Sequence, residues 1–351
     1  MRLDQALTNA KRITRKGSLP ILANVRLSPK DGGIEVYATN LRVGWTCWVA
    51  GSINGTAVVD PKMLLPQVKG EREPTLRVEG RELSVGGMIL MGAKPEDFPP
   101  TPRVEDGTRY ALPEGWLTRA GDVSKAATAD GSRLTLTAVM WAPEEDVLVA
   151  ADGFRLRVSG AYAKPKGSQL LIPASGIHHI PKKVTAIEAS EIRARFDGEG
   201  ESLVVELVEG TFPSYRNLIP DGSRWSITGE VGPMYEAVKA CEPIARDDSG
   251  VVRIKVRARH PQDEPRRIEV SAWAQGIGDV SYDVPALVSD KIPGEVKIAM
   301  NVRYAIDALA TIAGMSNGFE LRGTSPTSLM IWTPSPRSEW LEIVMPMFVQ
   351  W

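Results

Sequence analysis

Apolar and polar residues alternate over short stretches of the chain, and three of these stretches share one pattern. The alternating runs are IEVYATNLRVGW from Ile34, VLVAADGFRLRV from Val147 and IEVSAWAQGIGDV from Ile268. Each run follows another strand-like run, and charged or glycine-containing turns lie between them in the first two cases. A period of two that is broken by such turns predicts β-hairpins. The recurrence at intervals of roughly 115 residues predicts an internal repeat.

Helical periodicity recurs in the same order. A helical pattern opens each repeat, and the three patterns cover Leu3–Ile13, Trp116–Ala127 and Pro233–Ile244. An extended apolar run that passes into a short helix follows the hairpin, and we expect its helix N-caps at Asp60, Ser175 and Asn301. A further strand (ELSVGG, SLVVELVEG or FELRG) comes after that helix. The chain is therefore predicted to form three similar α+β domains, at 1–107, 108–226 and 227–351.

Composition agrees with several folded domains. The chain has 351 residues, of which 43% are hydrophobic and 24% are charged, which is typical of a globular protein. No apolar run approaches the roughly 18 residues of a membrane span, and no signal peptide is recognisable at the N-terminus. Two isolated cysteines, Cys47 and Cys241, favour neither a disulfide framework nor a zinc site. We therefore expect a cytoplasmic protein.

The net charge of −1 hides an uneven distribution of basic residues. Basic side chains gather on the predicted helices and the turns beside them, whereas acidic residues gather in stretches such as PEED and DGEGESLVVELVEG. One interpretation is the ordinary solvated face of each helix. The other is a lining that attracts duplex DNA through its phosphates without reading sequence. The candidate DNA-binding residues are Lys11, Arg12, Arg15, Lys16, Arg119, Lys125, Arg133, Lys182, Lys183 and Lys239.

The sequence contains no recognisable catalytic constellation. Of the three histidines, His178 and His179 are adjacent and diverge on a helix, and His260 lies in a polar stretch. A P-loop, a GxGxxG motif after a strand, an HExxH motif and a GxSxG elbow are all missing. The pair Asp247–Asp248 is typical of a solvated turn rather than a metal site. We therefore predict no enzyme activity, no metal and no cofactor, and a β-rich hydrolase is disfavoured.

Seven short segments give the chain a family resemblance. In order they are LPILANVRL with ATNLRVG, EDFPPTP, VAADGFRLRV, GTFPSYRNLIP, NVRYAIDAL and the C-terminal VMPM. With the threefold repeat, these segments resemble the bacterial-type DNA polymerase III beta subunit, the sliding clamp. The match is divergent, so the resemblance also fits a viral or accessory clamp.

The resemblance implies a ring. Two chains would close head to tail as a homodimer, with domain 1 of one chain meeting domain 3 of the other. Helices would line the inside and antiparallel sheets would form the outside. Double-stranded DNA would thread the hole and be held by topology, while Lys16 and Arg133 match basic positions of the family. The replicative polymerase, the clamp loader and repair proteins would bind through short hydrophobic peptides.

The resemblance also implies a partner-peptide pocket between domains 2 and 3. Methionine suits such a pocket because its flexible thioether adapts to different partners. An alternative for Leu136, Leu156 and Ile343 is a purely structural role in the core. The implied pocket residues are Leu136, Ala151, Gly153, Phe154, Arg155, Leu156, Pro220, Asn301, Tyr304, Ser328, Ile343, Met345, Pro346 and Met347.

The chain departs from the family pattern in three places. A helical pattern already begins at Leu3, where the family has a short strand first, and Phe154 stands where the family often has histidine. The segment FVQW follows VMPM, and we expect Phe348 and Trp351 to extend the pocket or to fold over it. The function predicted is a clamp that tethers a polymerase for processive DNA synthesis. The alternative is a clamp-fold scaffold or decoy that binds partner peptides without a main role in replication.

Overall fold

The computed structural model describes residues 1–14, 19–160, 167–220, 222–247, 249–256, 267–289, 295–325 and 327–351. These residues form two compact units. Unit 1 contains Met1–Thr118 and Ile172–Glu209, and unit 2 contains Arg119–Leu171 and Gly210–Trp351. The predicted middle domain contributes to both units, so the boundaries at 107/108 and 226/227 stay predictions. Arg15 and Lys16 lie outside the described residues.

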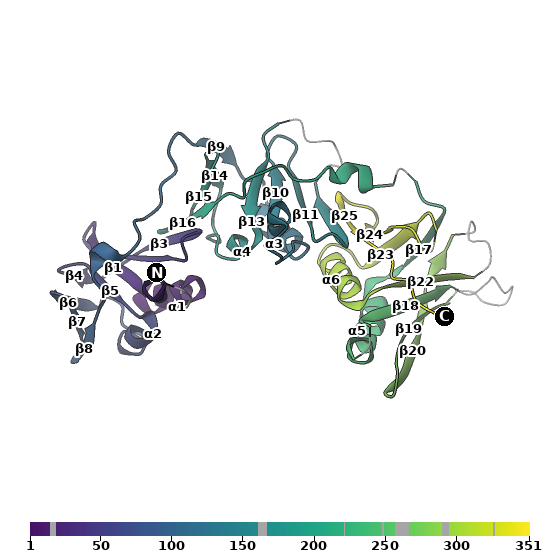
Figure 1. Cartoon of the computed structure of the whole chain (residues 1–351), viewed down its shortest axis with the longest axis horizontal. Helices are drawn as coiled ribbons and strands as arrows, with labels where there is room; N and C mark the ends of the chain where they lie inside the picture. Colours follow the sequence, from purple (N-terminus) through teal and green to yellow (C-terminus); the bar gives the residue numbers. More distant parts are fainter. Residues whose placement is uncertain are drawn as a thin grey trace. The chain divides into compact units, whose positions relative to one another are not determined.

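Unit 1 is built on an eight-stranded antiparallel sheet (Figure 1). Its strand order is β5 (Ala57–Val59), β1 (Val25–Lys30), β2 (Gly33–Thr39), β3 (Val43–Val49), β16 (Glu201–Glu206), β15 (Arg193–Asp197), β14 (Ala186–Ala189) and β9 (Thr108–Ala111). A smaller sheet has the order β4 (Ser52–Ile53), β6 (Thr75–Glu79), β7 (Glu82–Val85) and β8 (Met88–Met91). The short helices are α2 (Pro61–Leu64), α4 (Ala174–Ile177), η1 (Pro20–Ala23), η2 (Leu65–Gln67) and η3 (Pro95–Asp97).

Helix α1 (Leu3–Ile13) packs against β2 and β3 of this sheet. Its buried residues include Leu3, Ala6, Leu7, Ala10 and Ile13, at the three- and four-residue spacing of a helical stripe. Lys11 and Arg12 are exposed in its last turn. The amphipathic pattern therefore places these two cations in solvent, away from the face that covers the sheet.

Unit 2 contains a nine-stranded and a four-stranded antiparallel sheet. The first has the order β13 (Leu170–Pro173), β10 (Ala138–Ala142), β11 (Val147–Ala151), β12 (Arg155–Ser159), β25 (Trp340–Val344), β24 (Met330–Ser335), β23 (Gly318–Gly323), β17 (Trp225–Glu230) and β21 (Leu287–Val288). The second has the order β20 (Gly278–Pro285), β19 (Arg267–Ala274), β18 (Val251–Val256) and β22 (Val296–Asn301). Helices α5 (Val231–Arg246) and α6 (Val302–Ala313) pack side by side (Figure 1), and η4 (Leu134–Thr137) and η5 (Tyr215–Leu218) are short. Helix α3 (Trp116–Ser124) runs from unit 1 into unit 2.

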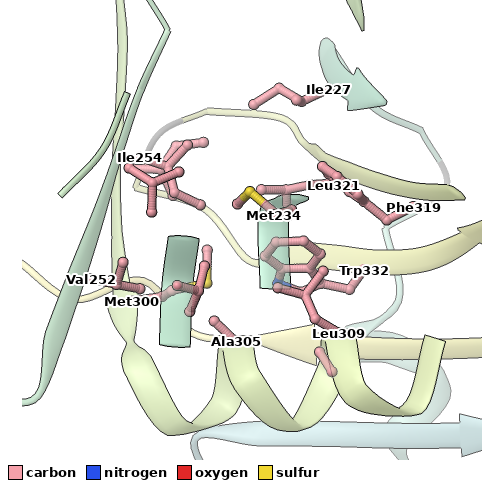
Figure 2. Packing of buried hydrophobic residues seen from close by; sticks show 14 of the residues in the cluster. Ile227, Met234, Val252, Ile254, Met300, Ala305, Leu309, Phe319, Leu321 and Trp332 are labelled. Carbon is pink, nitrogen blue, oxygen red and sulfur yellow. The ribbon is translucent and has the colours of Figure 1, made fainter. Parts of the chain in front are cut away.

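The core of unit 2 lies between the two helices and the strands of both sheets. Figure 2 shows Met234, Leu309, Phe319, Leu321 and Trp332 converging on one apolar space, and each of these side chains is fully buried. The rings of Phe319 and Trp332 pack with their centroids 5.5 Å apart. Burying each of these side chains stabilises the fold by about 1.5–3 kcal/mol. The core therefore holds the helices and strands around it firmly in place.

Most predicted elements are confirmed. The first helix covers Leu3–Ile13 as predicted, the second ends earlier, at Ser124, and the third extends over Val231–Arg246. The N-caps at Asp60 and Asn301 are confirmed, since their side chains accept hydrogen bonds from the backbone N–H of Lys62 and Arg303.

The N-cap predicted at Ser175 is wrong. Helix α4 begins at Ala174, and Pro173 occupies the cap position. Strand β13 ends at Pro173, whose backbone is extended, so the helix starts two residues earlier than the serine suggests. Ser175 is therefore an exposed residue within the helix.

Candidate functional site

A tight turn between β11 and β12 carries Gly153, Phe154 and Arg155 of the predicted partner-peptide pocket. The region around these residues is called the candidate groove below. Oδ1 of Asp152 accepts hydrogen bonds from the backbone N–H groups of Phe154 (2.8 Å) and Arg155 (2.9 Å). The N–H of Asp152 donates to the carbonyl of Arg155 at 3.2 Å, which closes the turn. The turn presents Phe154 to solvent with 58% of its surface exposed.

The backbone conformation inside this turn favours glycine. Gly153 has a φ of +94°, a conformation that other residues adopt at a cost of about 1–2 kcal/mol. A Cβ added there would lie 2.5 Å from Nη1 of Arg133. The same Nη1 donates to the carbonyl of Asp152 at 2.9 Å, and Nε of Arg133 lies 3.2 Å from Oδ2 of Asp130. Arg133 therefore lies on the groove wall, and its predicted DNA role stays a prediction.

The C-terminal strand contributes to the candidate groove as well. β25 pairs antiparallel with β12, so Ile343 lies opposite Leu156. Directly after β25, the N–H of Met345 donates to the carbonyl of Phe154 at 2.9 Å. Met345 is 45% exposed, and the bond fixes it beside the exposed Phe154. The paired ends of β12 and β25, called the joint below, thus present two large apolar side chains, Phe154 and Met345, to solvent.

The start of α6 supplies a third group of predicted residues. Asn301 caps the helix, and Tyr304 in its first turn is half-buried. The Cζ atom of Arg155 lies 4.4 Å from the centroid of the Tyr304 ring. Burial raises the pKa of Tyr304 to about 12, with a further contribution from the Asp152 carboxylate. The phenol is therefore neutral at physiological pH and offers an amphipathic surface.

A network of charged side chains connects the three elements that carry the candidate groove. Nη1 of Arg155 lies 2.8 Å from Oδ2 of Asp307 and 3.6 Å from Oε1 of Glu342, and Nε lies 3.2 Å from Oδ2 of Asp152. One guanidinium group thus joins the turn, helix α6 and strand β25. Burial lowers the pKa of Arg155, but the nearby carboxylates outweigh this effect and the net shift is upward.

Glu342 and Arg157 are the fully buried members of the network. Nε of Arg157 donates to Oε2 of Glu342 at 2.9 Å, and Nη2 of Arg157 bonds to the same oxygen. Nη1 of Arg157 donates to the carbonyl of Asp122 at 2.6 Å. Burial raises the pKa of Glu342, and the guanidinium groups of Arg157 and Arg155 oppose that shift.

The remaining predicted pocket residues lie in unit 2 as well. Leu156 and Ile343 are buried, which agrees with their alternative role in the core. Leu136, Ala151, Pro346 and Met347 are half-buried, and the N–H of Met347 donates to the carbonyl of Ala299 on β22 at 2.8 Å. Pro220 is half-buried after η5, and the Ser328 hydroxyl accepts from the N–H of Ser325 in a local turn.

The predicted DNA-binding residues differ in whether their charges are exposed or paired with a carboxylate. Lys11, Arg12 and Lys182 are exposed, and the Lys239 ammonium lies 5.3 Å from the Tyr235 ring centroid. Arg119 pairs with Asp146 at 2.6 Å, and Lys125 pairs with Asp122 at 2.7 Å. Lys183 pairs with Glu199 at 2.6 Å on the surface. Among the predicted residues that the structure describes, Lys11 and Arg12 at the end of α1 are exposed cations for which it shows no ion pair.

Sequence reasoning missed Arg157, Glu342 and Asp307 as parts of the site. For Arg157 and Glu342 the signal was a charged residue at a strand position that alternation or an apolar run would make internal, in FRLRV and in WLEIVM. Asp307 lies on α6 and left no such signal. No group of three or more His, Cys, Asp or Glu side chains that could hold a metal ion occurs in the described ranges. Among the helices that the structure describes, none is long and apolar enough to cross a membrane.

Comparisons with known proteins agree with the predicted resemblance. The family model for the C-terminal domain of the DNA polymerase III beta subunit matches residues 216–348. The beta sliding clamp of Bacillus subtilis is 22% identical over 334 residues, covering 87% of this chain and 86% of the relative. The beta sliding clamp of Staphylococcus aureus is 22% identical over 346 residues, covering 90% of this chain and 89% of the relative.

Solved structures agree on the fold. The DNA polymerase III beta subunit of Thermotoga maritima superposes with a TM-score of 0.84 at 23% identity, covering 99% of this chain and 98% of that one. The sliding clamp of Bacillus subtilis has a TM-score of 0.84 at 17% identity, with coverage of 99% and 97%. The predicted α+β clamp-type fold is therefore confirmed, and the low identities confirm that the chain is divergent.

Proposed function

We propose that this chain is a divergent member of the DNA polymerase III beta subunit family of sliding clamps and that it encircles duplex DNA as a head-to-tail homodimer. In this role it tethers the replicative polymerase, the clamp loader and repair proteins for processive synthesis. In this proposal the chain acts in the cytoplasm by binding DNA and other proteins, and not as an enzyme. Its three domains follow the repeat, at 1–107, 108–226 and 227–351.

The observation that carries this proposal is the exposed pair Phe154 and Met345 at the joint of β12 and β25. The backbone bond of 2.9 Å between them and the buried core beneath hold the pair in place. A rigid apolar surface with a polar base is what a short hydrophobic peptide needs, because little ordering entropy is lost on binding. The adaptable thioethers of Met345 and Met347 suit several partner sequences.

Retention on DNA comes from topology and not from tight contacts. Lys11 and Arg12 at the end of α1 supply free positive charge, and sparse phosphate contacts give weak, salt-dependent attraction that permits sliding. Free binding to short duplexes is therefore weak. A loader is needed to place the ring on closed circular DNA.

The groove is tested by titrating a labelled hydrophobic clamp-binding peptide into the wild type and into Met345→Asp. We expect affinity to fall at least about tenfold in the variant, since a buried unpaired carboxylate costs more than about 1.4 kcal/mol. Leu287→Asp is the matched control, because Leu287 is 71% exposed and lies on β21, at the edge of the nine-stranded sheet. Equal binding by wild type and Met345→Asp would contradict the groove assignment.

The replication role is tested by primer extension on closed circular DNA with a loader and a polymerase. We expect Lys11→Glu/Arg12→Glu to lose most of the stimulated synthesis. Arg77→Glu, an exposed cation on β6, should keep it. A double variant that stimulates synthesis like the wild type would favour a scaffold or decoy without a replication role.

A further inference from the structure

The turn that forms the groove in unit 2 has a close copy in unit 1. Oδ1 of Asn40 accepts from the N–H groups of Arg42 (3.1 Å) and Val43 (2.8 Å), and the Asn40 N–H donates to the Val43 carbonyl at 3.2 Å. The corresponding bonds of Asp152 measure 2.8, 2.9 and 3.2 Å. The same three-bond pattern therefore connects β2 to β3 and β11 to β12.

The strand pairing beside this turn is repeated as well. β3 pairs antiparallel with β16, and the N–H of Glu206 donates to the carbonyl of Arg42 at 2.8 Å. This bond is the counterpart of the bond from Met345 to Phe154. Glu206 thus occupies the position of Met345 in the repeat, and Arg42 occupies that of Phe154.

The third match is an unusual backbone conformation. Leu41 has a φ of +77°, at the position where Gly153 has +94°. A leucine in this region carries strain of about 1–2 kcal/mol, and strained residues concentrate at binding sites. The Leu41 side chain is 50% exposed, so core packing does not account for the leucine.

A cavity of about 450 Å³ opens at this second joint. Its lining includes Thr39, Leu41 and Glu206, the counterparts of Ala151, Gly153 and Met345. The cavity is also lined by residues 99–103, here called the strap. The Tyr37 hydroxyl donates to the Pro100 carbonyl at 3.0 Å, and Nη2 of Arg26 donates to Oγ1 of Thr101 at 2.7 Å, so the strap is fixed. The volume falls in the range of ligand pockets.

The chemistry of the second cavity differs from that of the first groove. Two guanidinium groups, Arg103 and Arg193, and two carboxylates, Glu105 and Glu206, line it. In the part of the chain that the structure describes, none of these four side chains forms an ion pair with another. Nη1 of Arg193 donates only to the carbonyl of Arg103, at 3.4 Å. Arg193 and Glu206 lie opposite each other in the register of β15 and β16, so charges of both signs line the cavity beside the exposed Leu41.

We propose that this cavity is a second peptide-binding groove, which takes an extended segment with an acidic and a basic side chain flanking a small aliphatic one. The aliphatic side chain packs on Leu41, the acid pairs with Arg193 or Arg103, and the base pairs with Glu206. The inference rests on the proposed function, because the first groove defines the repeated joint as a peptide site. One clamp then holds two partner segments of different chemistry.

The test uses the full chain and two labelled probes, the peptide Gly-Glu-Val-Lys-Gly and the hydrophobic peptide that defines the first groove. At low salt we expect saturable binding of the mixed-charge probe. Glu206→Arg and Arg193→Glu should each weaken it about tenfold, as expected for the loss of a charge-assisted bond. Leu41→Gly, which keeps the backbone conformation, should weaken it by removing the apolar contact. Each variant should bind the hydrophobic probe like the wild type, which shows that unit 2 is unaffected, and should keep the wild-type circular dichroism spectrum, which shows that unit 1 stays folded.

Three results would overturn the proposal: no saturable binding of the mixed-charge probe, equal binding by the charge-reversed variants, or loss of that probe in Met345→Asp. The last result would place both peptides in one groove. A failure of the proposed function is distinguishable. In that case the hydrophobic probe does not bind, while the mixed-charge probe still binds and still responds to Glu206→Arg.

Discussion

The carboxylate of Glu342 on β25 accepts a 2.9 Å hydrogen bond from Nε of Arg157 on β12, and both side chains are fully buried. This pair crosses the joint that carries Phe154 and Met345. A buried ion pair is weak evidence for stability by itself, because desolvation offsets most of the attraction. It does make the joint sensitive to the loss of either partner.

Replacing Arg157 with Met should lower the free energy of unfolding by about 3–5 kcal/mol, because the Glu342 carboxylate then loses its nearest partner. Urea denaturation followed by tryptophan fluorescence measures the change. The double variant Arg157→Met/Glu342→Leu should recover most of the loss, since it removes both charges. A double variant as unstable as the single one would contradict this account.

Replacing Gly153 with Ala should weaken hydrophobic-peptide binding several-fold. The new Cβ meets a positive φ and lies 2.5 Å from Nη1 of Arg133, so the turn and the Arg133 side chain must shift. Gly131→Ala is the matched control, because a Cβ at Gly131 meets nothing within 4 Å. Peptide titration of both variants gives the comparison. An equal affinity for Gly153→Ala and the wild type would show that the turn geometry is not needed.

The chain after the groove runs along β22. The N–H of Met347 donates to the carbonyl of Ala299, and the Trp351 ring centroid lies 5.7 Å from Nζ of Lys297. This path leads toward the start of β22 and away from Asn301 and Tyr304 at its end. The geometry therefore gives no support to the expectation that Phe348 and Trp351 fold over the groove.

Removal of 349–351 should accordingly leave the affinity for the hydrophobic peptide unchanged. Titration of the truncated chain beside the full chain measures this. Met345→Asp in the truncated background is the positive control and should still lose binding. A several-fold gain in affinity on truncation would restore the idea that the tail competes for the groove.

Glu320 should give the fold a pH dependence at acid pH. Nε and Nη2 of Arg337 lie 2.5 and 2.7 Å from its oxygens, and this bonding holds the pKa of Glu320 below its usual 4.5. At a pH between the folded-state and unfolded-state pKa values of Glu320, the unfolded chain binds more protons than the folded chain. The free energy of unfolding therefore rises with pH in this range. The stabilisation is complete above pH 4.5 and is lost as the pH falls through the lower folded-state value.

Urea unfolding over this acid range tests the effect. The wild type should lose more stability on acidification than Glu320→Gln, which has no proton to gain at this position. Identical slopes for the two proteins would show that the Arg337 contact contributes nothing to the pH response.

The sequence could predict what local periodicity and repetition specify. The helix at Leu3–Ile13 and the caps at Asp60 and Asn301 follow from apolar spacing and cap chemistry, which depend on neighbours along the chain. The family resemblance then placed Phe154 and Met345 in one groove.

The charge network could not be predicted in the same way. Arg157 and Glu342 are 185 residues apart, and only the β12–β25 register makes them partners. The second groove likewise depends on the joint between β3 and β16. A positive φ at leucine leaves no compositional signal, so the sequence does not distinguish Leu41 from other turn residues.

The edge strand β8 should form half of the dimer contact. It ends the order β4-β6-β7-β8, and its Ile89 and Met91 side chains are 64% and 67% exposed. β20 likewise ends the four-stranded sheet of unit 2, with Tyr282 exposed. An apolar edge strand of this kind pairs readily with another chain, so we expect β8 of one protomer to extend the β20 sheet of its partner. Ile89→Lys/Met91→Lys should then give a monomer by light scattering at micromolar concentration, where we expect a dimer for the wild type. Met63→Lys, an exposed apolar residue on α2, should leave the dimer intact. A wild type that scatters as a monomer would contradict the ring, and a dimeric β8 variant would move the interface to another edge.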